Sequence, residues 1–537
     1  MTSLLFIPSS RLKRILAVGC SALLFTALAP PLQAATLRMA IQGEPASLAP
    51  AKVNGTVFDN DVLGDLYEGL VTLDASGDYI PGVASGWQVS DDGRVYTFEL
   101  REDARWSDGE PVRAVDFVTA FRTALDPKSP SVYASLFYPI EGAQRAARGE
   151  TALESIGVSA QDERHLRIEL VQPITYLPAL LAHIAASPLP THLIERLGDD
   201  WSNIDEIVTN GAFAPRSWVS HDHLSAVKNP YFHAAESVAL EGIDYYPIED
   251  PAAGVQRFRA GEFDVVRSFP VGDYPRLAQQ LGEEVRLSTE LGVYYYAFNQ
   301  REGQPTSDER VREALSLAID REVIADKIMQ GTVVPAEGFV PPGVDHYRGA
   351  RMPGLDAPLD QRQARARALL SDAGYSPASP LELRLAFNEN RANRSIAIAA
   401  AAMWRAIGVE TELVNTEASV HFSNLAGGQF GIGRASWIGD YDDADNFLGI
   451  LKSGNAKNYG GYRDDEFDAL LERAAAEQDQ QRRAAILQAA EAKALGDYAL
   501  LPLYFDASRN LVAEGVKGWQ DNVLNRHLAR WLSLQAQ

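Results

Sequence analysis

The sequence is poor in the residues that cross-link small proteins or hold metals: it has one cysteine, Cys20, and nine histidines among 537 residues. Cys20 lies in an N-terminal segment that we expect to be removed, so the mature chain would contain no disulfide. Its stability must then come from large hydrophobic cores, and its length allows roughly three domains of about 100 to 200 residues. Small disulfide-stabilised folds are excluded.

Signatures of metal sites and hydrolases are also missing. The histidines form no HExxH pair, and His221-Asp222-His223 is too short a cluster to hold zinc alone. The acidic stretch from Asp440 fails as a calcium loop, because its sixth and twelfth positions are Asp445 and Leu451 instead of glycine and glutamate. A Gly-x-Ser-x-Gly elbow is absent, which removes one serine-hydrolase route. We therefore predict no catalytic residue, no metal and no cofactor.

Basic residues are fewer than acidic ones: 49 lysines and arginines against 72 aspartates and glutamates give a formal charge of −23. This excess argues against nucleic acid or an anionic membrane surface as a partner. It mildly favours cationic ligands, but it would equally serve only to keep an abundant exported protein in solution. Composition leaves both interpretations open.

Residues 1–34 have the layout of a secretory signal peptide: a basic start at residues 11–14, an apolar run over 15–28 and a small-residue end at Ala34. The run is too short to span a bilayer comfortably, and no later segment approaches the roughly 20 apolar residues of a membrane helix. A lipoprotein interpretation, with cleavage leaving Cys20 acylated, is disfavoured because only four apolar residues would precede that cut. We predict a periplasmic protein without a lipid anchor.

The remaining chain is globular nearly throughout, with strand and helix patterns and no internal repeat. Residues 94–100 alternate apolar and polar side chains behind a turn, which predicts a half-buried strand. Asp116 is expected to open an amphipathic helix that Asp126-Pro127 stops. Further expected elements are a strand over 293–299, a capped helix from Ser307 that runs on past Arg321, helices over 361–373 and 395–407, and a strand over 409–414. Such αβ units are typical of a mixed sheet.

Three segments carry a resemblance to a known family. Between Leu66 and Pro130 the chain reads LYEGL and then PGVASGWQVSDDGRVYTFELREDARWSDGEPVRAVDFVTAFRTALDPKSP, and IVTNGAF at 207–213 and VQRFRAGEFD at 255–264 follow in the same order. The chain resembles the extracellular solute-binding proteins, family 5, of peptide and nickel ABC importers, and within that family the oligopeptide binders. The resemblance runs from about residue 39 to 529.

The resemblance implies an α/β fold with two lobes, an extra small domain, mixed sheets and hinge strands between the lobes. The implied parts are a first lobe over 35–67, 191–292 and 507–537, a small domain over 68–190 within that lobe, and a second lobe over 293–506. The chain would cross between lobes near residue 293 and return near 507. The resemblance also implies a monomer that binds its ligand in the cleft between the lobes.

Residues 434–441 are implied to line that cleft. Asp440 aligns with an aspartate that pairs with the α-ammonium of a peptide, and Arg434 with an arginine that meets its carboxylate end. The chemistry agrees, because an ammonium stripped of water needs an anion, and the planar fork of arginine can pair with both oxygens of a carboxylate. Alternatively, Arg434 and Asp440 could serve each other as a structural ion pair.

Other ligand contacts are implied with weaker support. Thr56, next to Asn54 and Gly55, would lend its backbone N–H and C=O to a bound peptide; the family has an acidic residue where Asn54 stands. Asn393 stands where oligopeptide binders carry a histidine, which puts the ligand's length in doubt. The remaining candidate contacts are Tyr133, Ser436, Trp437, Ile438 and Tyr441. For Tyr133, packing in a core is an equal alternative.

The predicted function is capture of a short peptide as an added strand, followed by closure of the lobes and delivery to a membrane permease. Murein-derived peptides, dipeptides, haem or a metal chelate are alternative ligands that the family implies. An exported hydrolase or a chaperone is a more remote alternative. A hydrolase needs a paired acid and base that the sequence does not offer, and a cleft that clamps both peptide termini would reject long unfolded chains.

Overall fold

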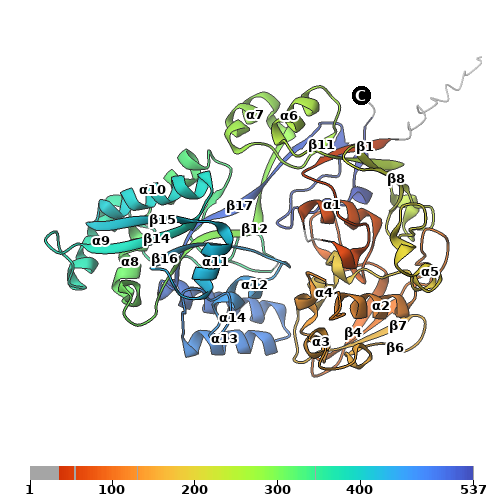
Figure 1. The fold of residues 1–537 in the computed structure, drawn as a ribbon, viewed down its shortest axis with the longest axis horizontal. Coiled ribbons are helices and arrows are strands. Elements are labelled where there is room, and N and C mark those ends of the chain that lie inside the picture. Colours follow the sequence, from red (N-terminus) through yellow and green to blue (C-terminus); the bar gives the residue numbers. More distant parts are fainter. Residues whose placement is uncertain (1–34, 54–55, 130, 345, 536–537) are drawn as a thin grey trace, which may run out of the picture.

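A computed structural model describes residues 35–53, 56–129, 131–344 and 346–535. The expected signal peptide with Cys20, and the candidate contacts Asn54 and Gly55, lie outside these ranges. The chain forms two lobes, drawn left and right in Figure 1, with long strands passing between them. In the described ranges no helix is both long and apolar enough to cross a bilayer.

One mixed sheet of eleven strands runs through both lobes. Its order is β15-β14-β16-β12-β17-β11-β1-β10-β9-β8, and β13 pairs with β17. The strands are β1 (Thr36–Ile41), β8 (Phe213–Val219), β9 (His223–Lys228), β10 (Gly242–Pro247), β11 (Val265–Val266), β12 (Val285–Phe298), β13 (Val334–Pro335), β14 (Leu381–Asn388), β15 (Val409–Thr416), β16 (Ile432–Ile438) and β17 (Leu500–Val512).

Strands β12 and β17, here called the hinge strands, join the two lobes (Figure 1). The first half of β12 pairs with residues 507–511 of β17, and its second half pairs with both β17 and β16. The register between the hinge strands shifts between Thr289 and Val293. Such an irregularity bends a strand locally and leaves backbone and side chains outside the regular ladder. The predicted strand over 293–299 is therefore the second half of a longer element.

A separate four-stranded sheet belongs to the small domain, shown in orange in Figure 1. Its order is β4 (Ala84–Val89), β5 (Val95–Leu100), β7 (His165–Glu169) and β6 (Val158–Ala160), and β2 (Val71–Leu73) pairs with β3 (Tyr79–Pro81) nearby. Strand β5 confirms the strand predicted over 94–100, since Phe98 and Leu100 are fully buried. The helix predicted at Asp116 is α2 (Ala114–Ala124), which begins two residues earlier because Asp116 accepts the N–H of Arg113.

Helices cover both faces of the second-lobe sheet. They are α8 (Glu309–Ala318), α9 (Leu359–Asp372), α10 (Arg391–Arg405), α11 (Ala418–Ala426), α12 (Asp445–Leu448), α13 (Asp465–Ala476) and α14 (Gln480–Gly496). The first lobe and small domain carry α1 (Val57–Leu66), α3 (Ala143–Ala147), α4 (Leu177–Leu181), α5 (Thr191–Leu197), α6 (Pro251–Arg259) and α7 (Tyr274–Leu281). Alternate side chains of β12 enter two cores: Tyr294 and Tyr296 on one face, Val293 and Tyr295 on the other.

Two helix predictions differ from the structure. The helix predicted to run past Arg321 is wrong in length: α8 ends at Ala318, Ile319 is extended, and a π-helical segment over 323–328 follows. Arg321 is instead buried and donates to the carbonyl of Pro502 at 2.9 Å, a contact that a continuous helix would not give. Helix α10 begins before the predicted residue 395, because the side chain of Asn390 caps it.

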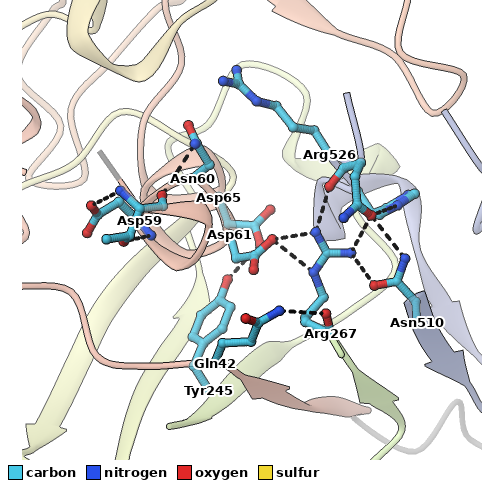
Figure 2. Close-up of polar contacts among 12 residues, drawn as sticks. Gln42, Asp59, Asn60, Asp61, Asp65, Tyr245, Arg267, Asn510 and Arg526 are labelled. Carbon is cyan, nitrogen blue, oxygen red and sulfur yellow. Dashed lines mark hydrogen bonds and ion pairs between the residues drawn. The ribbon is translucent and has the colours of Figure 1, made fainter. Parts of the chain in front are cut away.

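A buried charge network ties α1 to the C-terminal segment (Figure 2). The Arg267 guanidinium lies 2.9 Å from Asp61 Oδ1 and donates to Asn510 Oδ1 at 2.9 Å. It also donates to the side-chain and backbone oxygens of Asn525, at 3.0 and 2.6 Å. The side chains of Arg267 and Asp61 are only 2% and 8% exposed. This network fixes Asn525 beside the hinge strands.

Asp65, one turn after Asp61, accepts the hydroxyl of Tyr245 at 2.6 Å and the N–H of Ala529 at 2.7 Å. Burial raises the pKa of Asp65 to about 7, although the hydrogen bond from Tyr245 opposes the shift. Between about pH 4 and pH 7 the folded protein therefore holds a proton on Asp65 that the unfolded chain has released. The stability linked to this proton is complete below about pH 4 and is lost as the pH rises towards 7.

We expect Asp65→Asn to remove this pH dependence, since the amide carries no charge at any of these pH values. Relative to the variant, the wild-type protein should lose up to about 4 kcal/mol of unfolding free energy between pH 4 and pH 7.5. Urea unfolding of both proteins at several pH values measures the difference. A difference that stays constant over this range would contradict the prediction.

Candidate functional site: the cavity beside the hinge strands

A cavity of about 280 Å³ opens between the lobes where the hinge strands shift register. It is lined by Val57, Asn60 and Asp61 of α1; Tyr133 and His183 of the small domain; Glu290, Leu291, Gly292 and Asp506 of the hinge strands; Ile438 at the end of β16 with Gly439 and Asp440 after it; and residues 523–526 near the C-terminus. We call this space the interlobe cavity. Of the predicted contacts, Tyr133, Ile438 and Asp440 line it.

Strand β16 explains why only part of the predicted segment reaches the cavity. Successive side chains of a strand point to opposite faces, so Ser436 and Ile438 lie on the face of Arg434 while Trp437 lies on the other. Ile438 is 71% exposed at the cavity wall. The indole of Trp437 instead donates to Asn446 Oδ1 at 2.8 Å and packs against the core of the second lobe. In this structure Trp437 is therefore outside the cavity.

Asp440 is the carboxylate that the second lobe presents to the cavity. It is solvent-exposed, and within the described ranges it has no hydrogen bond or ion pair. Desolvation by the cavity walls raises its pKa, while the charge of Lys457 acts in the opposite direction. A structural ion pair between Asp440 and Arg434, the alternative considered from the sequence, is not formed here. Asp440 thus remains free to accept a cationic group.

Neighbouring side chains hold Arg434 in place, but they do not use all of the N–H donors of its guanidinium. Its guanidinium lies 4.7 Å from the ring centroid of Tyr294, and its Nη1 donates to Asn388 Oδ1 at 3.3 Å. Its Nε is buried and has no hydrogen-bond partner among the described residues. The buried Asn393 joins the same group, because it donates to Asn388 at 3.1 Å and accepts the Tyr294 hydroxyl at 3.1 Å. The structure thus brings Arg434 and Asn393 together through two shared neighbours.

Thr56 and Tyr133 approach the cavity from the first lobe. Thr56 caps α1: its Oγ1 accepts the N–H of Asp59 at 3.2 Å, and its own N–H donates to the Asp59 carboxylate at 2.8 Å. In this structure that N–H is occupied by the cap, and its use by a ligand stays a prediction. Tyr133 packs edge-on against His183 at 4.1 Å. Burial lowers the pKa of His183 well below its usual value, so the imidazole is neutral.

Tyr441 contacts the small domain instead of the interlobe cavity. Its ring stacks on Tyr176 with centroids 4.9 Å apart. The next residue, Asp442, donates its N–H to the hydroxyl of Tyr79 at 3.0 Å, and Asp443 forms a two-point ion pair with Arg483. These residues connect the small domain to the second lobe. The predicted contact segment therefore divides after Asp440: Ile438 and Asp440 line the cavity, whereas Tyr441 serves an interdomain contact.

Sequence reasoning missed the charged residues that the hinge strands and the C-terminal segment bring to the cavity: Glu290, Asp506 and Arg526. For Asp506 a signal existed, because a carboxylate interrupts the otherwise apolar run over 499–507. Glu290 and Arg526 lie in polar surroundings and offered none. In Figure 2 the Arg526 side chain extends away from the network around Arg267, and no contact is marked at its guanidinium.

Comparison with known proteins places this architecture in a family. Residues 78–459 match the model of the bacterial extracellular solute-binding proteins, family 5. The chain belongs to this family. The resemblance inferred from residues 66–130, 207–213 and 255–264 is thereby confirmed, as is the two-lobe α/β fold. Members of this family are binding proteins of transport systems and not enzymes.

Three curated relatives come from Escherichia coli. The chain is 33% identical over 491 residues to the periplasmic oligopeptide-binding protein, covering 90% of each chain. It is 34% identical over 485 residues to the periplasmic murein peptide-binding protein, again covering 90% of each. It is 35% identical over 493 residues to a probable deoxycholate-binding periplasmic protein, covering 90% of this chain and 91% of the relative.

Two solved structures indicate the state of the lobes. The unliganded open form of the murein tripeptide-binding protein matches with a TM-score of 0.87 at 33% identity, covering 93% of this chain and 97% of that one. The Haemophilus influenzae oligopeptide-binding protein in complex with RPPGFSPFR matches with a TM-score of 0.71 at 31% identity, covering 93% and 98%. Because coverage of this chain is equal, the higher score indicates that the lobes are arranged as in an open form.

Proposed function

We propose that this protein is the periplasmic binding component of an ABC importer and captures short peptides in the interlobe cavity. The observation that carries the proposal is the pair of partly unpartnered charges on one segment: the free carboxylate of Asp440 and the guanidinium of Arg434. Six extended residues span at most about 20 Å. A zwitterion of a few residues therefore suits the two charges.

In this proposal the α-ammonium of the peptide meets Asp440 and its carboxylate meets Arg434. Both are charge-assisted pairs, and the planar fork of Arg434 suits a carboxylate. Main-chain hydrogen bonds along the cleft supply further affinity with little selection of side chains. Closure of the lobes about β12 and β17 then buries the ligand, and the permease recognises the closed form.

The domain boundaries belong to the same proposal. We assign 35–67, 191–292 and 507–537 to the first lobe, 68–190 to the small domain and 293–506 to the second lobe. The four-stranded sheet falls within the second of these ranges, and the register shift of the hinge strands falls at the boundary near residue 293. Of the contact residues proposed here, Asp440, Ile438 and Tyr133 line the interlobe cavity, whereas Arg434 and Asn393 lie outside its lining and are linked to each other through Asn388 and Tyr294.

Two relatives are named for other ligands, one for murein peptides and one for deoxycholate. A bile acid has a carboxylate but no ammonium, so it would use Arg434 and leave Asp440 unpaired. Haem and metal chelates likewise offer no ammonium. The free carboxylate of Asp440 therefore favours peptides, including murein-derived ones, over these ligands.

Native mass spectrometry of the mature protein, purified from the periplasm, tests the proposal directly. We expect copurified masses that fit peptides of two to five residues and that disappear on mild denaturation. A uniform mass that fits deoxycholate or another compound without an amine would overturn the peptide assignment while leaving the family membership intact. If the protein is isolated without a ligand, added tripeptides should give a new mass equal to that of the protein plus one peptide.

A further inference from the structure

Two further carboxylates face the interlobe cavity from the hinge strands. Glu290 lies at the register shift of β12, and Asp506 lies opposite on β17. A Cβ atom at Gly292 would come within 2.5 Å of Asp506 Oδ2. The carboxylate of Asp506 therefore lies directly over the backbone of Gly292, and a side chain at residue 292 would displace it. The arrangement holds an acidic group at the cavity wall.

These two carboxylates are poorly compensated. Within the described ranges Asp506 has no hydrogen bond or ion pair, and Glu290 accepts only the amide of Asn525, at 2.7 Å. Desolvation raises the pKa of both groups, and the charge of Asp506 raises the pKa of Glu290 further. A desolvated carboxylate without a counter-charge is costly, so a cation placed between them would relieve both.

The neighbouring cations act on the hinge carboxylates through their charges and without contact: Arg434 and Arg509 on Asp506, and Arg267 and Arg509 on Glu290. The guanidinium of Arg509 donates to the backbone carbonyls of Phe269 and Ala507. Arg267 is fully used by Asp61, Asn510 and Asn525. Among the described residues, no cation therefore forms a direct contact with either hinge carboxylate.

Arg526 lines the same cavity, and Asp61 is the carboxylate whose charge acts on it. Arg526 and Asp440 both act on Tyr133, which lines the cavity with them. His183 is neutral, as described above. The side of the cavity near the hinge thus combines Asp440, Glu290 and Asp506, and within the described ranges no cation forms a hydrogen bond or ion pair with any of the three carboxylates.

We propose that Glu290 and Asp506 form a second cation subsite, which selects peptides carrying an arginine or lysine side chain at or next to the free N-terminus. This inference rests on the proposed function and names the substrate class within it. The ammonium at Asp440 and the side-chain cation share one cavity of about 280 Å³, so the two positive groups must lie close together along the peptide. A charge-assisted hydrogen bond to a fixed carboxylate supplies the preference.

The test compares peptides that differ in charge but scarcely in shape. Arg-Ala-Ala and citrulline-Ala-Ala are titrated into the mature protein by isothermal calorimetry at pH 7, together with Ala-Ala-Arg and Ala-Ala-citrulline. We expect the N-terminal arginine peptide to bind at least about tenfold more tightly than its citrulline counterpart, since breaking such a pair typically costs 1.4 kcal/mol or more. The C-terminal pair should differ much less.

Asp506→Asn and Glu290→Gln are the matched variants, because each removes one charge and retains the shape. Each should reduce the arginine-to-citrulline ratio while leaving the affinity for citrulline-Ala-Ala within about threefold. Equal affinities of the wild-type protein for the two N-terminal peptides would overturn the subsite, even if neither variant folds. If no peptide binds at all, the proposed function itself fails, which is a distinguishable outcome.

Discussion

Asp440→Asn is expected to weaken the binding of a free tripeptide by roughly 30-fold or more, which corresponds to about 2 kcal/mol. The substitution retains the shape of the side chain but removes the charge that would compensate the desolvated α-ammonium. Because Asp440 is exposed and has no partner within the described part of the chain, its loss should leave the stability of the empty protein unchanged. Isothermal titration calorimetry with Ala-Ala-Ala, and urea unfolding without ligand, measure the two effects.

An N-acetylated peptide supplies the control, since it lacks the ammonium. The wild-type protein should bind it about as weakly as Asp440→Asn binds the free peptide, and the variant should distinguish little between the two. This pattern would assign the interaction to the ammonium and not to a general loss of affinity. If the variant lost the same affinity for both peptides, Asp440 would not be the ammonium site.

Arg267→Met is expected to lower the unfolding free energy by about 3 to 5 kcal/mol, the largest change in stability that the structure leads us to predict. Methionine can fill the space of the arginine stem, but it leaves Asp61 buried without its partner and removes the donors to Asn510 and Asn525. Protonation of Asp61 at low pH would offset part of this loss. Urea unfolding at pH 7.5 and pH 5 measures both quantities.

The double variant Arg267→Met with Asp61→Asn separates two contributions to the loss of stability: the unpaired buried charge of Asp61 and the lost contacts of the arginine side chain. Removing the carboxylate should recover a substantial part of the stability, because an uncompensated charge is the main cost. As a comparison, Arg94→Met removes an ion pair with Asp92 whose two side chains are 54% and 58% exposed, and should change the stability by less than about 1 kcal/mol. A loss at Arg267 as small as that at Arg94 would contradict the account of the network.

Local patterns were sufficient for much of the fold. The alternation over 94–100 and the strand formers over 293–299 identified β5 and part of β12, because burial on one face follows directly from the order of residues. The end of α8 was not predictable in this way. The extended conformation of Ile319 ends α8, and a second helical stretch begins at Arg321, whose side chain makes a buried contact with Pro502, far away in the chain.

The site divides in a similar manner. Asp440, Ile438 and Tyr133 were predicted and line the cavity, whereas Trp437 and Tyr441 pack elsewhere, since strand alternation and an aromatic contact with Tyr176 direct them away. Glu290 and Asp506 meet only because two strands more than 200 residues apart pair out of register. Asp506 stands out as a carboxylate in an apolar run, but no local pattern shows that it lies near Glu290, so this pairing required the tertiary structure.

The hinge strands also couple the melting of the two lobes. Strand β17 places Leu501 in a core of the second lobe and Val512 in the core of the first lobe, and both residues belong to one continuous strand. If one lobe unfolded alone, the parts of β12 and β17 in the other lobe would lose hydrogen-bond partners and core contacts. Heat should therefore denature both lobes in a single cooperative transition, despite their separate hydrophobic cores.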